Sequence, residues 1–200
     1  MFGLTAVLAL ALAAAPACTD SPTSPASTTV VAFGDSITFG IGATDNNDYV
    51  ARLASRTSVP IVNAGRPGDT TGDALNRITS AVLSRDPDIV IVFLGGNDLL
   101  QNVPVQQRIS NITTIVDRIR GDGAAVILVG LGNVPLDPFE GALPAIASQT
   151  SSILVPAVLE GIFGVPGFMT DAIHPNDAGH AIIADRIEPA LRNALAAVGS

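Results

Sequence analysis

Residues 88–94 read DIVIVFL and give the clearest strand signal of the chain. After the first aspartate, every residue is β-branched, aromatic or leucine, so the segment has no polar face. A strand that is apolar on both faces must be covered on both faces, which is typical of a parallel sheet in an α/β protein. Residues 124–129 (AAVILV) and 30–33 (VVAF) have the same character. These three runs predict the centre of such a sheet.

Amphipathic segments separate the apolar runs. Between residues 70 and 85, apolar side chains recur at helical spacing, and Thr70 or Thr71 can cap the first turn. Residues 104–120 begin with a proline and end before Gly121, as helices often do. We expect helices at 48–57, 70–85, 104–120 and from Asn176 or Asp177 to about 197, and short strands at 60–62 and 153–155. Alternating strands and helices predict a five-stranded parallel sheet with helices on both faces.

The N-terminus differs from the rest of the chain. Residues 2–15 are apolar apart from Thr5, are too short for an ordinary membrane span, and lead into small residues before Cys18. We expect residues 1–17 to be a secretory signal. Cys18 is then either an ordinary mature residue or the acylated first residue of a lipoprotein. Residues 18–29 are rich in Ser, Thr and Pro and predict an extended tether before a domain at 30–200.

Composition excludes several classes of protein. The 200 residues carry a net charge of -8, and every basic residue is arginine, without any basic run. The sequence therefore lacks the basic cluster that nucleic-acid binding requires. Cys18 is the single cysteine, which rules out an internal disulfide and a cysteine-based zinc site. The oligomeric state stays open.

Polar and glycine residues follow three of the predicted strands. Ser36 comes after the first strand in the sequence Gly-Asp-Ser, Gly65 ends the segment Asn-Ala-Gly, and Asn97 follows paired glycines. Each motif alone is compatible with an ordinary turn. The carboxyl ends of parallel strands meet at one edge of a sheet, so the three residues are expected to share a cleft. There Ser36 is a candidate nucleophile, and Gly65 and Asn97 are candidate donors to an oxyanion.

A histidine and an aspartate follow the last strand. Asp171 precedes His174 by three residues, so its carboxylate can bond one ring nitrogen and leave the other to face a hydroxyl. His180 falls inside the last predicted helix, where we expect packing rather than catalysis. A metal site formed by Asp171, His174 and His180 is a weaker alternative. The pattern favours a Ser36, Asp171 and His174 triad.

These blocks resemble the GDSL, or SGNH, hydrolases. The four blocks are residues 34–36, 63–65, 95–98 and 171–174, and the phrases VNAGRPGDTT and IHPNDAGH are similar to the bacterial thioesterase, lysophospholipase and arylesterase branch. The resemblance implies a flavodoxin-like three-layer α/β/α fold and hydrolysis of acyl esters without metal or cofactor. It implies Ser36 as nucleophile, His174 as base and Asp171 as its partner. The oxyanion hole would comprise Ser36, Gly65 and Asn97.

Two departures from the family pattern bear on the substrate. Arg66 follows Gly65, and a cation there favours anionic substrates. Residues 132–152 look short, and three prolines at 135, 138 and 144 limit any helix in a segment that walls the acyl pocket of relatives. We expect short- to medium-chain acyl esters, including aryl esters, lysophospholipids and thioesters. The alternatives are a carbohydrate O-acetyl esterase and a non-catalytic lipoprotein. The candidate pocket residues are apolar: Leu99, Leu100, Val103, Leu143, Val165 and Phe168.

Overall fold

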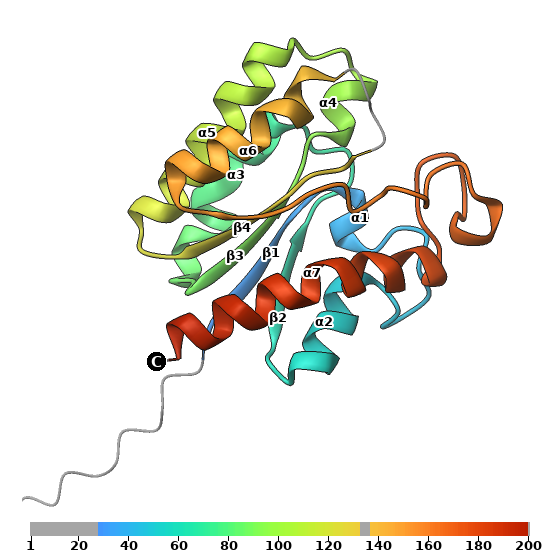
Figure 1. Ribbon diagram of the computed structural model, residues 1–200, viewed down its shortest axis with the longest axis horizontal. Coiled ribbons are helices and arrows are strands. Elements are labelled where there is room, and N and C mark those ends of the chain that lie inside the picture. Colours follow the sequence, from blue (N-terminus) through green and yellow to red (C-terminus); the bar gives the residue numbers. More distant parts are fainter. Residues whose placement is uncertain (1–27, 133–136, 200) are drawn as a thin grey trace, which may run out of the picture.

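Five parallel strands form the centre of the protein (Figure 1). The computed structural model describes residues 28–132 and 137–199. In sheet order the strands are β2 (Ile61–Gly65), β1 (Val30–Gly34), β3 (Ile89–Phe93), β4 (Ala125–Val129) and β5 (Ile153–Val155). Every neighbouring pair is parallel. The predicted five-stranded parallel sheet is confirmed. The expected signal peptide and Cys18 lie outside the described residues.

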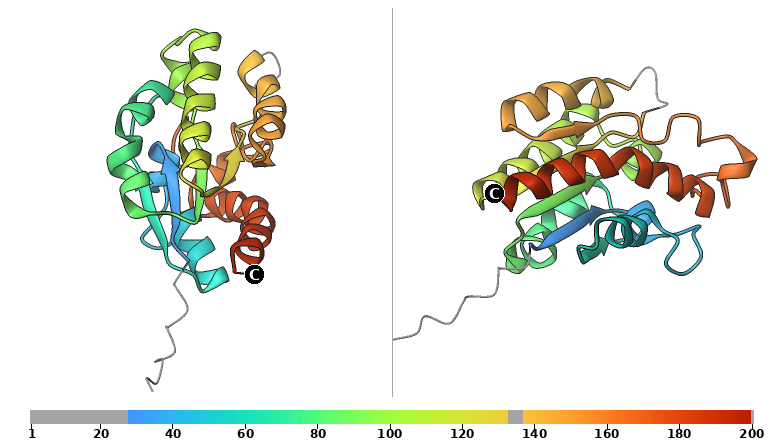
Figure 2. Two further views of the ribbon diagram at one scale, coloured as in Figure 1. Left: turned by 90° about the vertical axis from the view of Figure 1, so that its left-hand side faces the viewer. Right: turned by 60° about the horizontal axis from the view of Figure 1, so that its bottom comes forward.

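Helices cover both faces of the sheet, which confirms the three-layer architecture (Figure 2). One face is covered by α2 (Tyr49–Thr57) and α7 (Asp177–Val198), and the other by α3 (Thr71–Ala81), α5 (Val105–Gly121) and α6 (Pro138–Thr150). Two short helices, α1 (Ser36–Phe39) and α4 (Gly96–Leu100), directly follow β1 and β3. They occupy the carboxyl edge of the sheet, where the candidate residues fall.

The strands are buried on both faces because their side chains alternate between two cores. In β1, Val30 and Ala32 pack toward α2 and α7, whereas Val31 and Phe33 pack toward α3, α5 and α6. All four side chains are fully buried. Residues i and i+2 of a strand share a face, so an uninterrupted apolar run supplies both cores at once.

The helix starts follow local capping signals. Thr70 accepts from the backbone N–H of Asp73, whose carboxylate accepts from the N–H of Thr70, so the two form a capping box at α3. Asn176 caps α7 by accepting from two backbone N–H groups. The expected helix at 70–85 is shorter than predicted, because α3 ends at Ala81 and a 3-10 turn follows at Leu83–Arg85.

Helix α6 corrects the expectation for residues 132–152. It runs for 13 residues despite its prolines. Pro138 occupies the first turn, where its missing N–H has no intrahelical partner. Pro144 lies inside the helix, which compensates by burying an apolar face of Phe139, Leu143, Ile146 and Ala147. The helix start is also anchored, because the Asp137 carboxylate accepts two bonds from the Arg108 guanidinium of α5.

Candidate active site

The nucleophile candidate lies where β1 turns sharply into α1. A side chain on Gly34 would meet the Thr38 hydroxyl at 2.0 Å and the Phe93 carbonyl at 2.5 Å, so only glycine fits this strand end. Asp35 then caps α1, its Oδ1 accepting from the N–H of Ile37 at 3.0 Å. Ser36 is the first residue of α1, where helix geometry leaves backbone N–H groups without intrahelical partners. Both its hydroxyl and its N–H are thus available at the sheet edge.

Ser36, His174 and Asp171 form a continuous hydrogen-bonded row. The Nε2 atom of His174 lies 3.1 Å from Ser36 Oγ, and its Nδ1 atom lies 2.8 Å from an Asp171 carboxylate oxygen. The other Asp171 oxygen accepts from the backbone N–H of Ile173 and of His174. The bond to His174 is the largest cause that lowers the pKa of Asp171 to about 2, followed by the Ile173 bond. The carboxylate therefore stays ionised and holds the Nδ1 proton toward itself.

The loop that carries His174 is fixed from two sides. The N–H of Thr170 donates to the His174 carbonyl at 2.9 Å, and its hydroxyl donates to the Gly42 carbonyl at 2.7 Å. The N–H of Asn176 donates to the Phe168 carbonyl at 2.9 Å just before α7 begins. The imidazole is consequently held against α1 by backbone bonds on both sides of it.

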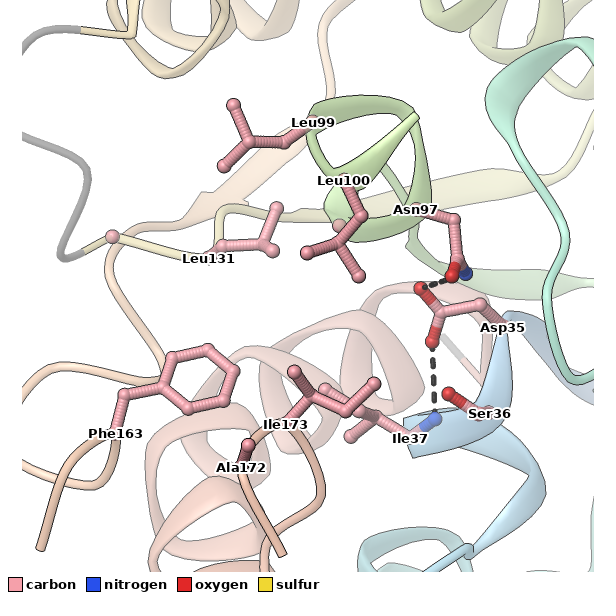
Figure 3. A pocket seen from close by; sticks show the side chains of 12 residues that line it. Asp35, Ser36, Ile37, Asn97, Leu99, Leu100, Leu131, Phe163, Ala172 and Ile173 are labelled. Atoms are coloured by element: carbon pink, nitrogen blue, oxygen red, sulfur yellow. Dashed lines mark hydrogen bonds between the residues drawn. The ribbon is translucent and has the colours of Figure 1, made fainter. Parts of the chain in front are cut away.

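Asn97 extends from α4 toward the same point. Its Nδ2 atom donates to the Asp69 carbonyl at 3.0 Å and lies 3.4 Å from the Asp35 carboxylate (Figure 3). The next residue, Asp98, is fully buried and accepts from the N–H and hydroxyl of Thr71 at the start of α3. This anchor leaves Asn97 with a fixed backbone and a donor close to Ser36.

Gly65 is near the site, but its amide is occupied. Its N–H donates to Asn63 Oδ1 at 2.9 Å, and a Cβ at this position would meet the backbone N of Phe39 at 2.2 Å. Three residues on, Gly68 has φ +83° in a tight turn closed by the Asp69 N–H on the Arg66 carbonyl. A Cβ on Gly68 would meet nothing within 4 Å. This loop thus places Gly68, not Gly65, in open space beside the Asp69 carbonyl that holds Asn97.

Asp35 is a candidate site residue that the sequence did not single out. It is only 6 % exposed, and burial raises its pKa from 3.8 to about 6 despite the bond from Ile37 and the charge of His174. A buried carboxyl with a raised pKa, next to Ser36 in sequence and 3.4 Å from Asn97 Nδ2, is a candidate functional group. Asp35 directly follows a strand that is apolar on both faces, and this position in the sequence indicates that its side chain is buried.

A cavity of about 240 Å³ opens beside Ser36 (Figure 3). Its polar end is formed by Asp35, Ser36 and Asn97. The rest is mostly apolar and comes from the segments that follow β3, β4 and β5 and from the triad loop: Leu99, Leu100, Leu131, Gly132, Phe163, Ala172 and Ile173, with Ile37 from α1. An acyl chain attached to a carbonyl at Ser36 has apolar walls available here.

The predicted pocket residues divide into two groups. Leu99 and Leu100 line the cavity, whereas the other four lie elsewhere. Leu143 belongs to α6 and is buried in the core between this helix and the sheet, and Phe168 packs against the core on the α7 side. Val103 follows α4, and Val165 is 37 % exposed at the start of a 3-10 turn. The walls that sequence reasoning missed, such as Leu131 and Phe163, lie in loops whose course no local pattern indicates.

His180 is a packed histidine of α7. Its ring is fully buried, accepts from the Tyr49 N–H at 3.2 Å and faces the Ile41 carbonyl at 3.4 Å. Burial lowers its pKa, so the neutral ring is favoured. It does not join Asp171 and His174, and within the described ranges no three His, Cys, Asp or Glu side chains are grouped to hold a metal ion.

Comparison with known proteins agrees with this geometry. Residues 32–182 match the GDSL-like Lipase/Acylhydrolase family. The chain is 32% identical to Esterase TesA of Pseudomonas aeruginosa over 179 residues, which are 84% of this chain and 89% of that protein. It is 30% identical to Thioesterase 1/protease 1/lysophospholipase L1 of Escherichia coli K12 over 171 residues, 80% of this chain and 81% of that protein. A crystal structure of TesA superposes with a TM-score of 0.78 at 32% identity and covers 84% of this chain and 100% of that one. The chain therefore belongs to the GDSL-like lipase/acylhydrolase family and is an esterase of that fold.

Proposed function

We propose that this esterase cleaves short- to medium-chain acyl esters through an acyl-enzyme on Ser36. The observation that carries the proposal is the hydrogen-bonded row from Ser36 Oγ through His174 to Asp171, which opens on an apolar cavity. Aryl esters, lysophospholipids and thioesters all present an acyl carbonyl to such a site.

The reaction follows from the placement of the protons. His174 Nε2 accepts the Ser36 proton as Oγ attacks the carbonyl carbon, and Asp171 stabilises the resulting imidazolium. The tetrahedral intermediate collapses when His174 returns the proton to the leaving oxygen or sulfur, which departs as the alcohol or thiol. Water, deprotonated by His174, then attacks the acyl-enzyme and releases the acid and free Ser36.

The oxyanion needs donors at the polar end of the cavity. We infer that the Ser36 N–H and Asn97 Nδ2 act as donors, and that Gly68 supplies the third instead of Gly65. The Gly65 amide already donates to Asn63 Oδ1 at 2.9 Å, whereas one Asn97 hydrogen makes only a long contact with Asp35, at 3.4 Å, and can pass to the oxyanion. Gly68 lies in open space in the turn whose Asp69 carbonyl binds the other Asn97 hydrogen. Donors fixed before the reaction stabilise the developing charge without reorganisation.

The size of the cavity limits the acyl chain. The cavity volume of about 240 Å³ is below the roughly 300–1,000 Å³ of pockets that hold drug-sized ligands, so it suits a chain of several carbons and not a long fatty chain. We therefore propose an optimum at about four to eight carbons, with each buried methylene contributing about 0.8 kcal/mol until the cavity is full.

The test is a panel of p-nitrophenyl esters from acetate to decanoate, with Ser36→Ala and a phosphonate inhibitor. We expect one phosphonate label per chain on Ser36 and loss of hydrolysis in Ser36→Ala. The matched control is Ser80→Ala, a change on the exposed surface of α3 that should leave the rate unchanged. Full activity of Ser36→Ala would refute the mechanism, and an acetate-only profile would favour the carbohydrate O-acetyl esterase instead.

We also propose that the protein is exported and that Cys18 carries a lipid anchor. The support is the apolar leader that ends in small residues before the single cysteine. Across residues 28–132 and 137–199, the structure contains no helix long and apolar enough to cross a membrane. Cys18→Ala in the full-length chain should move the protein from the membrane fraction to the soluble exported fraction. If both the unchanged protein and Cys18→Ala are exported in soluble form, the signal is cleaved in the ordinary way and Cys18 is not lipidated.

A further inference from the structure

One guanidinium group joins the two strand ends that carry the reacting groups. Arg77, on α3, donates from Nη2 to the Gly34 carbonyl and from Nη1 to the Ala64 carbonyl, both at 3.0 Å. Gly34 ends β1 two residues before Ser36, and Ala64 lies near the end of β2. The guanidinium also lies over the Phe33 ring, 4.6 Å from its centre. Arg77 thus fixes the ends of two adjacent strands against each other and against α3.

The third bond of this group leads to the oxyanion donors. Arg77 Nε donates to the carboxylate of Asp69, whose side chain is only 3 % exposed. The Asp69 carbonyl accepts from Asn97 Nδ2, and its N–H closes the turn that contains Gly68. The position of Asp69 therefore determines the positions of both the Asn97 amide and the Gly68 turn.

These contacts form one path between nucleophile and oxyanion hole. We propose that Arg77 is a positioning residue that sets the separation between Ser36 Oγ and the donors to the oxyanion; the inference rests on the proposed function. Arg77 is not among the residues that line the cavity, so it acts through Gly34 and Asp69 and not on the substrate. A fixed separation matters because the oxyanion donors must meet charge that exists only in the transition state.

Lysine cannot reproduce this role. Arginine presents several N–H donors in a rigid plane, which here reach two carbonyls and one carboxylate at once. A lysine ammonium could neutralise Asp69 but lacks the planar fork that spans both strand ends. Arg77→Lys therefore keeps a positive charge beside Asp69 but removes the bonds that join the two strand ends. The variant separates the effect of the charge from the effect of the fixed strand separation.

The experiment compares Arg77→Lys, Arg77→Met and Asp69→Asn with the unchanged protein. We expect kcat to fall by roughly 10- to 100-fold in the arginine variants, since a misplacement of about 1 Å can cost 10²-fold, while KM changes less than about twofold. The affinity for an alkyl trifluoromethyl ketone, which forms a tetrahedral adduct at a serine, should fall by the same factor as kcat/KM. A merely structural role would not produce that proportionality.

The matched control is Arg56→Met. Arg56 also forms a bridging ion pair, with Asp185 and Glu188, but it joins α2 to α7 away from the cavity. Its loss should leave kcat and ketone affinity unchanged. If Arg77→Met does not fold, Arg77→Lys and Asp69→Asn carry the same measurement, with the active fraction counted by phosphonate labelling.

Two results would overturn the inference. The first is a normal kcat per labelled site in both Arg77→Lys and Asp69→Asn, so that any loss of rate comes from fewer labelled sites. The second is ketone affinity that stays constant while kcat falls. Hydrolysis that does not depend on Ser36 in the unchanged protein would instead refute the proposed function, and this inference with it.

Discussion

Asp35→Asn should change how the stability of the protein depends on pH. Burial raises the pKa of Asp35 from 3.8 to about 6, because the charged form is poorly solvated beneath α1. Between these values the folded protein holds a proton at Asp35 that the unfolded chain has released. Raising the pH through this window therefore favours unfolding, and the shift corresponds to about 3 kcal/mol of unfolding free energy lost by pH 7.

Urea unfolding at pH 4 and pH 8 measures this loss for the unchanged protein and the variant. Asparagine keeps an oxygen that can accept from the Ile37 N–H, so the cap of α1 can persist. Carboxylates with lowered pKa, such as Asp171, act in the opposite direction but are present in both proteins and cancel. We expect the unchanged protein to lose about 2 kcal/mol more than Asp35→Asn between the two pH values, because the unfolded chain has already released part of its proton at pH 4. If the unfolding free energies of both proteins depend on pH in the same way, the conclusion that the pKa of buried Asp35 is raised is refuted.

Two further predictions concern the oxyanion and the acyl wall. Asn97→Ala should lower kcat by about 10²- to 10³-fold with little change in KM, because its donor acts on charge that develops in the transition state; a rise in KM alone would make it a ground-state contact. Leu100→Trp should shift the acyl optimum toward acetate, since Leu100 lines the cavity, whereas Val165→Trp, outside the cavity, should not. If Leu100→Trp leaves the acyl optimum in the p-nitrophenyl panel unchanged, the acyl chain does not bind in this cavity.

The sheet could be predicted because its signal is local. Each central strand is an apolar run without polar residues, and such a run must be buried on both faces. The sequence of the strand alone therefore indicates a covered parallel sheet. The start of α3 was equally readable, because Thr70 and Asp73 form a capping box within four residues. Parallel strands then bring their carboxyl ends to one edge, so Ser36, Asn97 and His174 could be expected in one cleft without any knowledge of distances.

The cavity walls could not be predicted, because they depend on contacts distant in sequence. Leu131 and Gly132 turn into the cavity because their N–H groups donate to the Glu140 carboxylate of α6, at 3.1 Å each. Leu143 was expected on this wall, yet α6 presents it to the sheet. Helix α6 itself was not expected, because its prolines argue against a helix. Its start is anchored by an ion pair between Asp137 and Arg108, which is distant in sequence.

The strand order divides the site into two halves. Its switch point lies between β1 and β3, and Ser36 and Asn97 follow these two strands. The apolar cavity extends from there over the ends of β3, β4 and β5, and none of the described residues that line it comes from the loop after β2. If the acyl chain occupies this cavity, as proposed, we expect the leaving alcohol to face the β2 side, where the Arg66 side chain is 66 % exposed. A walled acyl side and an open alcohol side should make the enzyme selective for the acid and tolerant of the alcohol.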